Sequence, residues 1–254
     1  MKRLSIFIIT ILMLVTGIST RAQTPYDIAL ERILEAEQSG ATSLDLSSVG
    51  LTELPPEIGN LSNLQILRLQ YNQLDTLPSE IGNLTNLVDL ILISNGMTRL
   101  PPEIGNLTNL RKLHLGNNNL RRLPREIGNL TNLRELYLYN NDLNSLPREF
   151  ANLSVLQILN VDSNNLNNLP AGLGEIRNLS ELTITNNPLA SIPEEIRSAD
   201  ITTIKDYLRS RGGWHLRQIM IGIAAVAGIL LPLIMLIVFR YHYVRRPKSK
   251  RKHQ

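Results

Sequence analysis

The sequence predicts an α/β repeat solenoid with a parallel inner sheet and helical end caps, followed by one C-terminal transmembrane helix. Three observations lead to this prediction. A block of 23 residues recurs along the middle of the chain, a helical pattern flanks it on each side, and an uncharged apolar segment follows it. Repeats of this length are typical of solenoids, in which each turn closes its core only by stacking on its neighbours.

Residues 1–22 have the organisation of a secretory signal peptide. Lys2 and Arg3 precede a short apolar stretch, and Thr20 and Ala22 are small residues at the positions expected before a cleavage site. The apolar stretch is short for a complete membrane span. We therefore expect a cleaved signal peptide, with an uncleaved anchor as the alternative.

Residues 43–198 hold the repeat, which we interpret as seven turns, the first of them partial. Position 1 of the later turns is always leucine or isoleucine: Leu61, Leu84, Leu107, Leu130, Leu153 and Ile176. Apolar residues at positions 7 and 9 alternate with their neighbours, which is the spacing of a half-buried strand. One short strand per turn predicts a parallel sheet along the inner curve of the solenoid.

Three further positions of the repeat carry a structural prediction. The asparagine at position 12 is expected to bond backbone groups of a neighbouring turn. The proline at position 18 favours an irregular segment or a short 3₁₀ turn, because it lacks a donor and fixes φ. Glycines near the end of the turn are expected to let the chain reverse: Gly59, Gly82, Gly105, Gly128 and Gly174.

Helical patterns border the repeat on both sides. Residues 23–42 are interpreted as an N-terminal helical cap, in which apolar residues alternate with acidic ones at helical spacing. Residues 199–211 are interpreted as a C-terminal cap helix, which places Ile201, Ile204 and Leu208 on one face. Such caps shield the apolar ends of a stacked core from water.

One complete turn, residues 107–129, reads LTNLRKLHLGNNNLRRLPREIGN. In this pattern the chain resembles the leucine-rich-repeat superfamily, and within it the 23-residue LPxEIGNLxxL type found in bacterial and Ras-group proteins. The resemblance implies a horseshoe-shaped solenoid that binds a partner. In such proteins a closing helix often precedes a signalling domain, whereas here a linker and an apolar segment follow it.

Residues 212–218 are interpreted as a juxtamembrane linker and residues 219–239 as a transmembrane helix. The 21 residues of this segment are uncharged and would form a helix about 31 Å long, enough to cross the hydrocarbon core. The tail, residues 240–254, holds seven cations and is expected in the cytoplasm by the positive-inside rule. We therefore expect a single-pass protein of the cell membrane with its repeats outside the cytoplasm.

A pair of small residues in this apolar segment permits close approach of two helices. Ala224 and Gly228 are four residues apart, as in small-xxx-small motifs. The pair predicts a weak homodimer. Such pairs are also frequent by chance, and Pro232 favours a kink in the same helix instead.

The charge distribution argues against nucleic acid as a partner. The whole chain has a formal charge of +4, but residues 23–215 hold 15 Lys and Arg against 22 Asp and Glu, a net charge of −7. The excess of positive charge lies at the ends of the apolar segments, where it indicates the orientation of these segments in a membrane. The four histidines are scattered and no catalytic motif is present. We expect no enzymatic activity, no cofactor and no metal site.

A ligand site is predicted on the solvent side of the sheet, called the sheet face below. With positions 7 and 9 buried, positions 6, 8 and 10 point toward solvent. Apolar and aromatic residues gather there in the middle turns within a charged rim, as at interaction sites. We call this set the central patch: Asp89, Ile91, Ile93, Lys112, His114, Glu135, Tyr137 and Tyr139. Gly116 is expected to leave a hollow between Ile93 and Tyr139. The alternative is that these residues only favour strand formation.

Three functions are compatible with this organisation. The first is a surface recognition protein, receptor- or adhesin-like, that binds a protein, peptide or glycan ligand. The second is a scaffold that organises other envelope proteins. The third, an intracellular regulator like the Ras-group proteins, is disfavoured by the two apolar segments.

Overall fold

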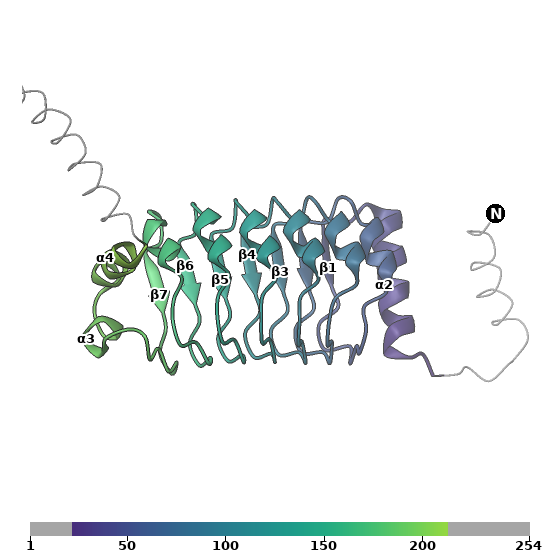
Figure 1. Ribbon diagram of the computed structural model, residues 1–254. Helices are drawn as coiled ribbons and strands as arrows, with labels where there is room; N and C mark the ends of the chain where they lie inside the picture. Colours follow the sequence, from purple (N-terminus) through teal and green to yellow (C-terminus); the bar gives the residue numbers. More distant parts are fainter. Residues whose placement is uncertain (1–21, 213–254) are drawn as a thin grey trace, which may run out of the picture. The chain divides into compact units, whose positions relative to one another are not determined.

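The structure is a computed structural model, which describes residues 22–212. Its repeats form a single parallel sheet of seven strands in sequence order (Figure 1). The strands are β1 (Ser43–Asp45), β2 (Ile66–Arg68), β3 (Asp89–Ile91), β4 (Lys112–His114), β5 (Glu135–Tyr137), β6 (Ile158–Asn160) and β7 (Glu181–Thr183). Each residue pairs with the residue 23 positions later, for example Leu90 with Leu113. The predicted repeat solenoid with a parallel sheet is confirmed.

Short 3₁₀ helices alternate with the strands along the chain. They are η1 (Pro56–Asn60), η2 (Ser79–Asn83), η3 (Pro102–Asn106), η4 (Arg125–Asn129), η5 (Arg148–Asn152) and η6 (Ala171–Glu175). Each begins directly after a proline, whose φ lies between −54° and −69°. Proline fixes this angle and needs no hydrogen-bond acceptor there. The 3₁₀ turn expected at position 18 is thus confirmed.

The N-terminal end of the sheet is covered by helix α2 (Pro25–Ser39) (Figure 1). The Thr24 hydroxyl accepts from the N–H of Asp27, and the Asp27 carboxylate accepts from the N–H of Thr24, so two backbone donors of the first turn are satisfied. The helix is capped by Gly40, directly after its last residue, and the φ of +65° at Gly40 suits a residue without a Cβ. Its buried face includes Ala29 and Ile33.

Two short helices follow β7: α3 (Glu194–Arg197) and α4 (Ile201–Arg211). The chain divides into two compact units after Leu208. Ahead of that boundary, Lys205 is buried and its Nζ donates to the carbonyl oxygens of Arg177 and Leu179, at 3.3 and 3.2 Å. This lysine ties α4 to the last turn and satisfies carbonyls that have no further turn beside them.

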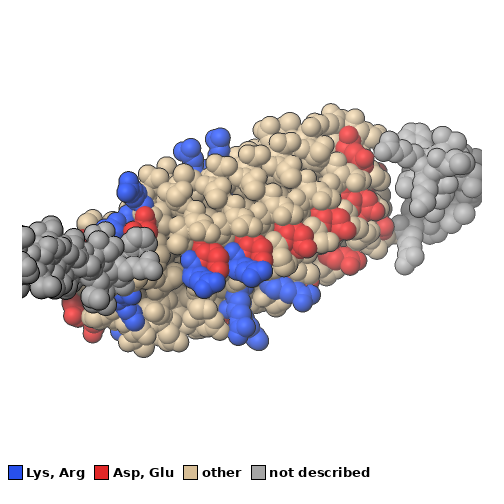
Figure 2. Space-filling view, turned by 45° about the horizontal axis from the view of Figure 1, so that its top comes forward, with Lys and Arg blue, Asp and Glu red and all other residues tan. Residues whose placement is uncertain are grey.

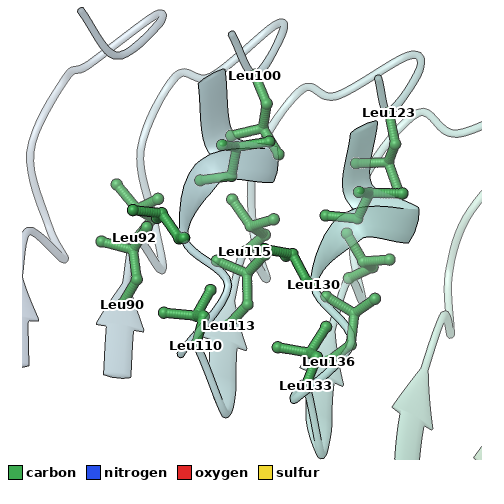
Figure 3. Close-up of a cluster of buried hydrophobic side chains, with 14 of the residues drawn as sticks. Leu90, Leu92, Leu100, Leu110, Leu113, Leu115, Leu123, Leu130, Leu133 and Leu136 are labelled. Atoms are coloured by element: carbon green, nitrogen blue, oxygen red, sulfur yellow. The ribbon is translucent and has the colours of Figure 1, made fainter. Parts of the chain in front are cut away.

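The core is a stack of leucines between the sheet and the returning chain. In Figure 3, Leu90, Leu113 and Leu136 lie side by side on neighbouring strands, and all three side chains are fully buried. Burial of each such side chain contributes about 1.5–3 kcal/mol to the stability of the folded chain. Because the contacts run from turn to turn, a single turn has little core of its own.

Asparagines at position 12 join neighbouring turns, as expected. Asn118 is buried, and its Nδ2 donates to the carbonyl oxygens of Leu92 and Leu115, at 3.0 and 3.1 Å. Its Oδ1 accepts from the backbone N–H of Met97 at 3.1 Å. One side chain thus satisfies backbone groups of its own turn and of the preceding one.

The predicted role of the glycines near the end of each turn is wrong. None of the five has a positive φ. Instead, most allow close approach: a Cβ on Gly105 would lie 2.7 Å from the carbonyl oxygen of Glu126 and 2.8 Å from its Cβ. Every turn has a left-handed residue at position 11, directly after the sheet-face residues: Ser48, Tyr71, Ser94, Asn117, Asn140, Ser163 and Asn186.

Figure 2 shows a row of acidic side chains along one face of the repeats, joined by basic side chains toward one end. The helices η1 to η5 carry a glutamate at their second residue: Glu57, Glu80, Glu103, Glu126 and Glu149. Arg125 pairs with Glu126 at 2.9 Å, and Arg148 with Glu149 at 3.1 Å. Such exposed pairs contribute little to stability. This face is a solvated surface of mixed charge.

Within residues 22–212, no helix is long and apolar enough to cross a membrane. Both apolar segments of the sequence, with the Ala224 and Gly228 pair and the basic tail, lie outside the described residues. The signal peptide, the transmembrane helix and the homodimer therefore stay predictions.

Candidate functional site

The eight residues of the central patch come from three neighbouring strands and the residues just after them. Register brings Asp89, Lys112 and Glu135 into one row across the sheet. A second row holds Ile91, His114 and Tyr137. All eight are partly buried rather than exposed, because adjacent strands bring their side chains against one another.

The row of charged residues is held by direct bonds. Lys112 Nζ lies 2.9 Å from Glu135 Oε1. The hydroxyl of Tyr137 donates to Glu135 Oε2 at 3.3 Å. The hydrogen bond and charge of Glu135, with the nearby carboxylate of Asp89, raise the pKa of Lys112. Lysine and glutamate thus form a charged border along one side of the aromatic residues.

The second row contains an aromatic stack. The rings of His114 and Tyr137 are 4.6 Å apart between centroids and inclined by 12°. Burial lowers the pKa of His114, since the charged ring loses water. Burial also raises the pKa of Tyr137, and the charge of Glu135 adds to that effect. Near neutral pH the stack is an uncharged surface beside a charged border.

The hollow predicted at Gly116 is filled. A Cβ on Gly116 would lie 2.3 Å from Cζ of Tyr139 and 2.5 Å from one Cε, so the tyrosine ring rests directly over the glycine backbone. Gly116 is buried as a result. The glycine therefore makes room for a ring of the next turn, and the ring adds to the aromatic surface instead of bordering a cavity.

Tyr71 was missed by the sequence prediction. It is the one large hydrophobic side chain that is mainly exposed in the described part of the chain, at 62%. The signal was present in the sequence, since the other turns have serine or asparagine at position 11. The alternation that located the central patch was applied only as far as position 10, and at position 11 the left-handed backbone interrupts that alternation.

Other features of the surface offer less for binding. A polar groove lies at positions 3 and 5 of the middle turns, where Asn109 and Arg111 are among its lining residues. Asn86, Asn109 and Asn132 each donate to a carbonyl of the preceding turn, so these amides already have partners. Across residues 22–212, no group of three or more His, Cys, Asp or Glu side chains is placed to hold a metal ion.

The stacked parallel sheet and its solvent-facing patch define a solenoid protein suited to protein–protein recognition. A family profile described as a leucine-rich repeat region matches residues 43–138 and 102–199. The chain belongs to the leucine-rich-repeat family. No curated protein was found to match the sequence.

Many solved structures are similar to the chain, among them the following two. A leucine-rich-repeat protein from Leptospira interrogans is 33% identical, with a TM-score of 0.50, over 60% of this chain and 45% of that one. The leucine-rich-repeat ectodomain of the plant membrane receptor kinase GASSHO1/SCHENGEN3 from Arabidopsis thaliana is 36% identical, with a TM-score of 0.50, over 53% of this chain and 17% of that one. That ectodomain was solved in complex with CASPARIAN STRIP INTEGRITY FACTOR 2. The chain thus matches less than half of either protein.

Proposed function

We propose that this chain is a membrane-anchored, extracytoplasmic recognition protein, receptor- or adhesin-like, which binds a protein or peptide through the central patch. Within its family we assign it to the 23-residue LPxEIGNLxxL type, on the spacing of its repeats. The proposal includes no catalytic step.

The observation that carries the proposal is the aromatic surface in the middle of the sheet face. His114 and Tyr137 stack on each other, and Tyr139 covers Gly116. The ion pair of Lys112 with Glu135 borders this surface. A large aromatic area beside a polar rim is the usual composition of a binding hot spot. The plant receptor kinase ectodomain, solved in a complex, offers a precedent for recognition by a similar solenoid.

Membrane anchoring rests on the sequence. Residues 219–239 are uncharged and long enough to cross a bilayer, and the seven cations after them favour a cytoplasmic tail. The signal-like residues 1–22 support export of the repeats. Protease added to intact cells should remove the repeats and spare the tail. Digestion of the tail with protection of the repeats would contradict this topology.

Binding is tested with the full chain in membranes and a double variant, Tyr137→Ala with Tyr139→Ala. Partners captured by the wild type are identified by mass spectrometry, purified, and titrated against both proteins. We expect at least a tenfold loss of affinity, since truncation of hot-spot residues costs about 2 kcal/mol or more.

The matched control is Thr183→Ala with Thr185→Ala, which changes positions 8 and 10 of the last turn. This pair should leave affinity unchanged, because it lies outside the central patch. If the tyrosine variant is folded and binds as tightly as the wild type, the central patch is not the site. A scaffold that uses other surfaces would then be the better account.

A further inference from the structure

Position 11 has the same backbone conformation in all seven turns. Its φ lies between +53° and +60°, the left-handed region that disfavours most side chains. Asparagine tolerates this region best among residues with a side chain. Six of the turns have serine or asparagine there, whereas the second turn has Tyr71 at a φ of +60°. A bulky residue is therefore held where a small polar one fits with less strain.

The small residues at position 11 also bond from turn to turn. Asn140 Nδ2 donates to Asn117 Oδ1 at 2.9 Å, and Asn117 Nδ2 donates to Ser94 Oγ at 3.4 Å. Asn186 Nδ2 donates to Ser163 Oγ at 3.2 Å in the last turns. The tyrosine at position 71 has no amide to continue this row. Tyr71 thus replaces a residue that would both relieve strain and join neighbouring turns.

The Tyr71 side chain gains little from burial in return, since it is 62% exposed. Strain held at an exposed position is typical of functional sites. The location agrees with this interpretation. The backbone N–H of Tyr71 donates to the carbonyl oxygen of Ile93 at 2.9 Å, so Tyr71 directly borders the central patch.

Gln70, the preceding residue, supplies an independent observation. It occupies position 10 of the sheet face, and its Oε1 is buried without a hydrogen-bond donor. A buried acceptor without a partner is costly. The side chain of Gln70 would regain a donor by turning outward, onto the surface that Tyr71 borders. A ligand that offers an N–H group there would satisfy it.

We propose that Gln70 and Tyr71 form a second contact that extends the central patch to β2, and that its occupant is an extended peptide segment. This inference rests on the proposed function. Ile91 and Ile93 connect the two contacts, and these side chains pack against apolar groups but offer no hydrogen bonds to sugar hydroxyls. An apolar peptide side chain would lie on Tyr71, while a backbone N–H would reach Gln70.

The test uses the full chain in detergent and peptides selected on the wild type from a phage-displayed library of random dodecapeptides. The informative variant is Tyr71→Asn, which restores the residue type of the other turns. We expect its Tm to rise, because strain is relieved, and its affinity for selected peptides to fall about tenfold. Ser48→Asn, at the same position of the first turn, is the control and should leave affinity unchanged.

Comparison with Tyr137→Ala and Tyr139→Ala separates this inference from the proposed function. If the selected peptides bind more weakly to Tyr71→Asn and also to the Tyr137 and Tyr139 double variant, the result supports both this inference and the proposed function. If the selected peptides depend only on the central tyrosines, the Tyr71 contact is overturned and the function stands. If peptide binding is unaffected by either change, or is weakened only by Tyr71→Asn, the central patch is not a binding site. The inference that Tyr71 extends the central patch is then overturned as well. A fall in Tm for Tyr71→Asn would make Tyr71 a structural residue and also overturn the inference.

Discussion

Ala151 and Gly172 occupy the positions that hold glycine and glutamate in the preceding turns, but here the residue with a Cβ comes first and the glycine second. In four preceding pairs, such as Gly105 and Glu126, a glycine makes room for the glutamate 21 residues later. In this pair the first residue has gained a methyl group and the second has lost its side chain. A Cβ on Gly172 would lie 2.5 Å from the Cβ of Ala151. The packing rule is one Cβ per pair, whichever turn supplies it.

This rule predicts the stability of three variants. Gly172→Glu alone should lower the free energy of unfolding by roughly 1–3 kcal/mol, because it places two Cβ atoms in the space of one. Adding Ala151→Gly should restore most of the loss, since the pair then matches Gly105 and Glu126. Chemical denaturation of the single and double variants measures the coupling. Additive effects would show that the two residues do not share this space.

The asparagine row predicts a difference between the middle and the end of the solenoid. Asn118→Ala should lower the free energy of unfolding by roughly 1–3 kcal/mol, because it leaves buried backbone groups without partners. Asn187 makes the same set of bonds, one accepted and three donated, but is less buried. Asn187→Ala should therefore cost less, since water replaces some of its bonds. Equal changes in the free energy of unfolding would contradict this explanation.

The pKa of His114 predicts a dependence of stability on pH. Burial lowers this pKa in the folded protein, so below about pH 6.5 the unfolded chain binds a proton that the folded chain does not. The free energy of unfolding should fall as the pH decreases through this range and level off below the folded pKa. His114→Phe keeps a ring against Tyr137 and removes the titration.

The measurement is the difference in unfolding free energy between wild type and His114→Phe, between about pH 7.5 and about pH 5. The difference cancels the shared contribution of carboxylates elsewhere in the chain. We expect it to shift in favour of the variant as the pH falls. A difference that is constant with pH would show that His114 has the same pKa in both states.

The sequence alone was enough to predict the architecture because its pattern recurs every 23 residues. Leucines at positions 7 and 9 predicted one strand per turn, and the constant 23-residue spacing set the pairing of Leu90 with Leu113. The bonds of Asn118 and the 3₁₀ helices after each proline follow from residue chemistry that acts within a turn or on its neighbour. Strand parity also selected the face that carries the central patch.

Only the tertiary structure decided how side chains of neighbouring turns share space. Strand parity shows which face a residue joins, but not that Tyr139 lies over Gly116 or that Tyr137 stacks on His114. Nor does sequence spacing show that Gly105 is needed for the approach of Glu126 and not for a chain reversal. These contacts join residues 21 or 23 positions apart. They exist only after the turns have stacked, because backbone separation then determines which side chains fit.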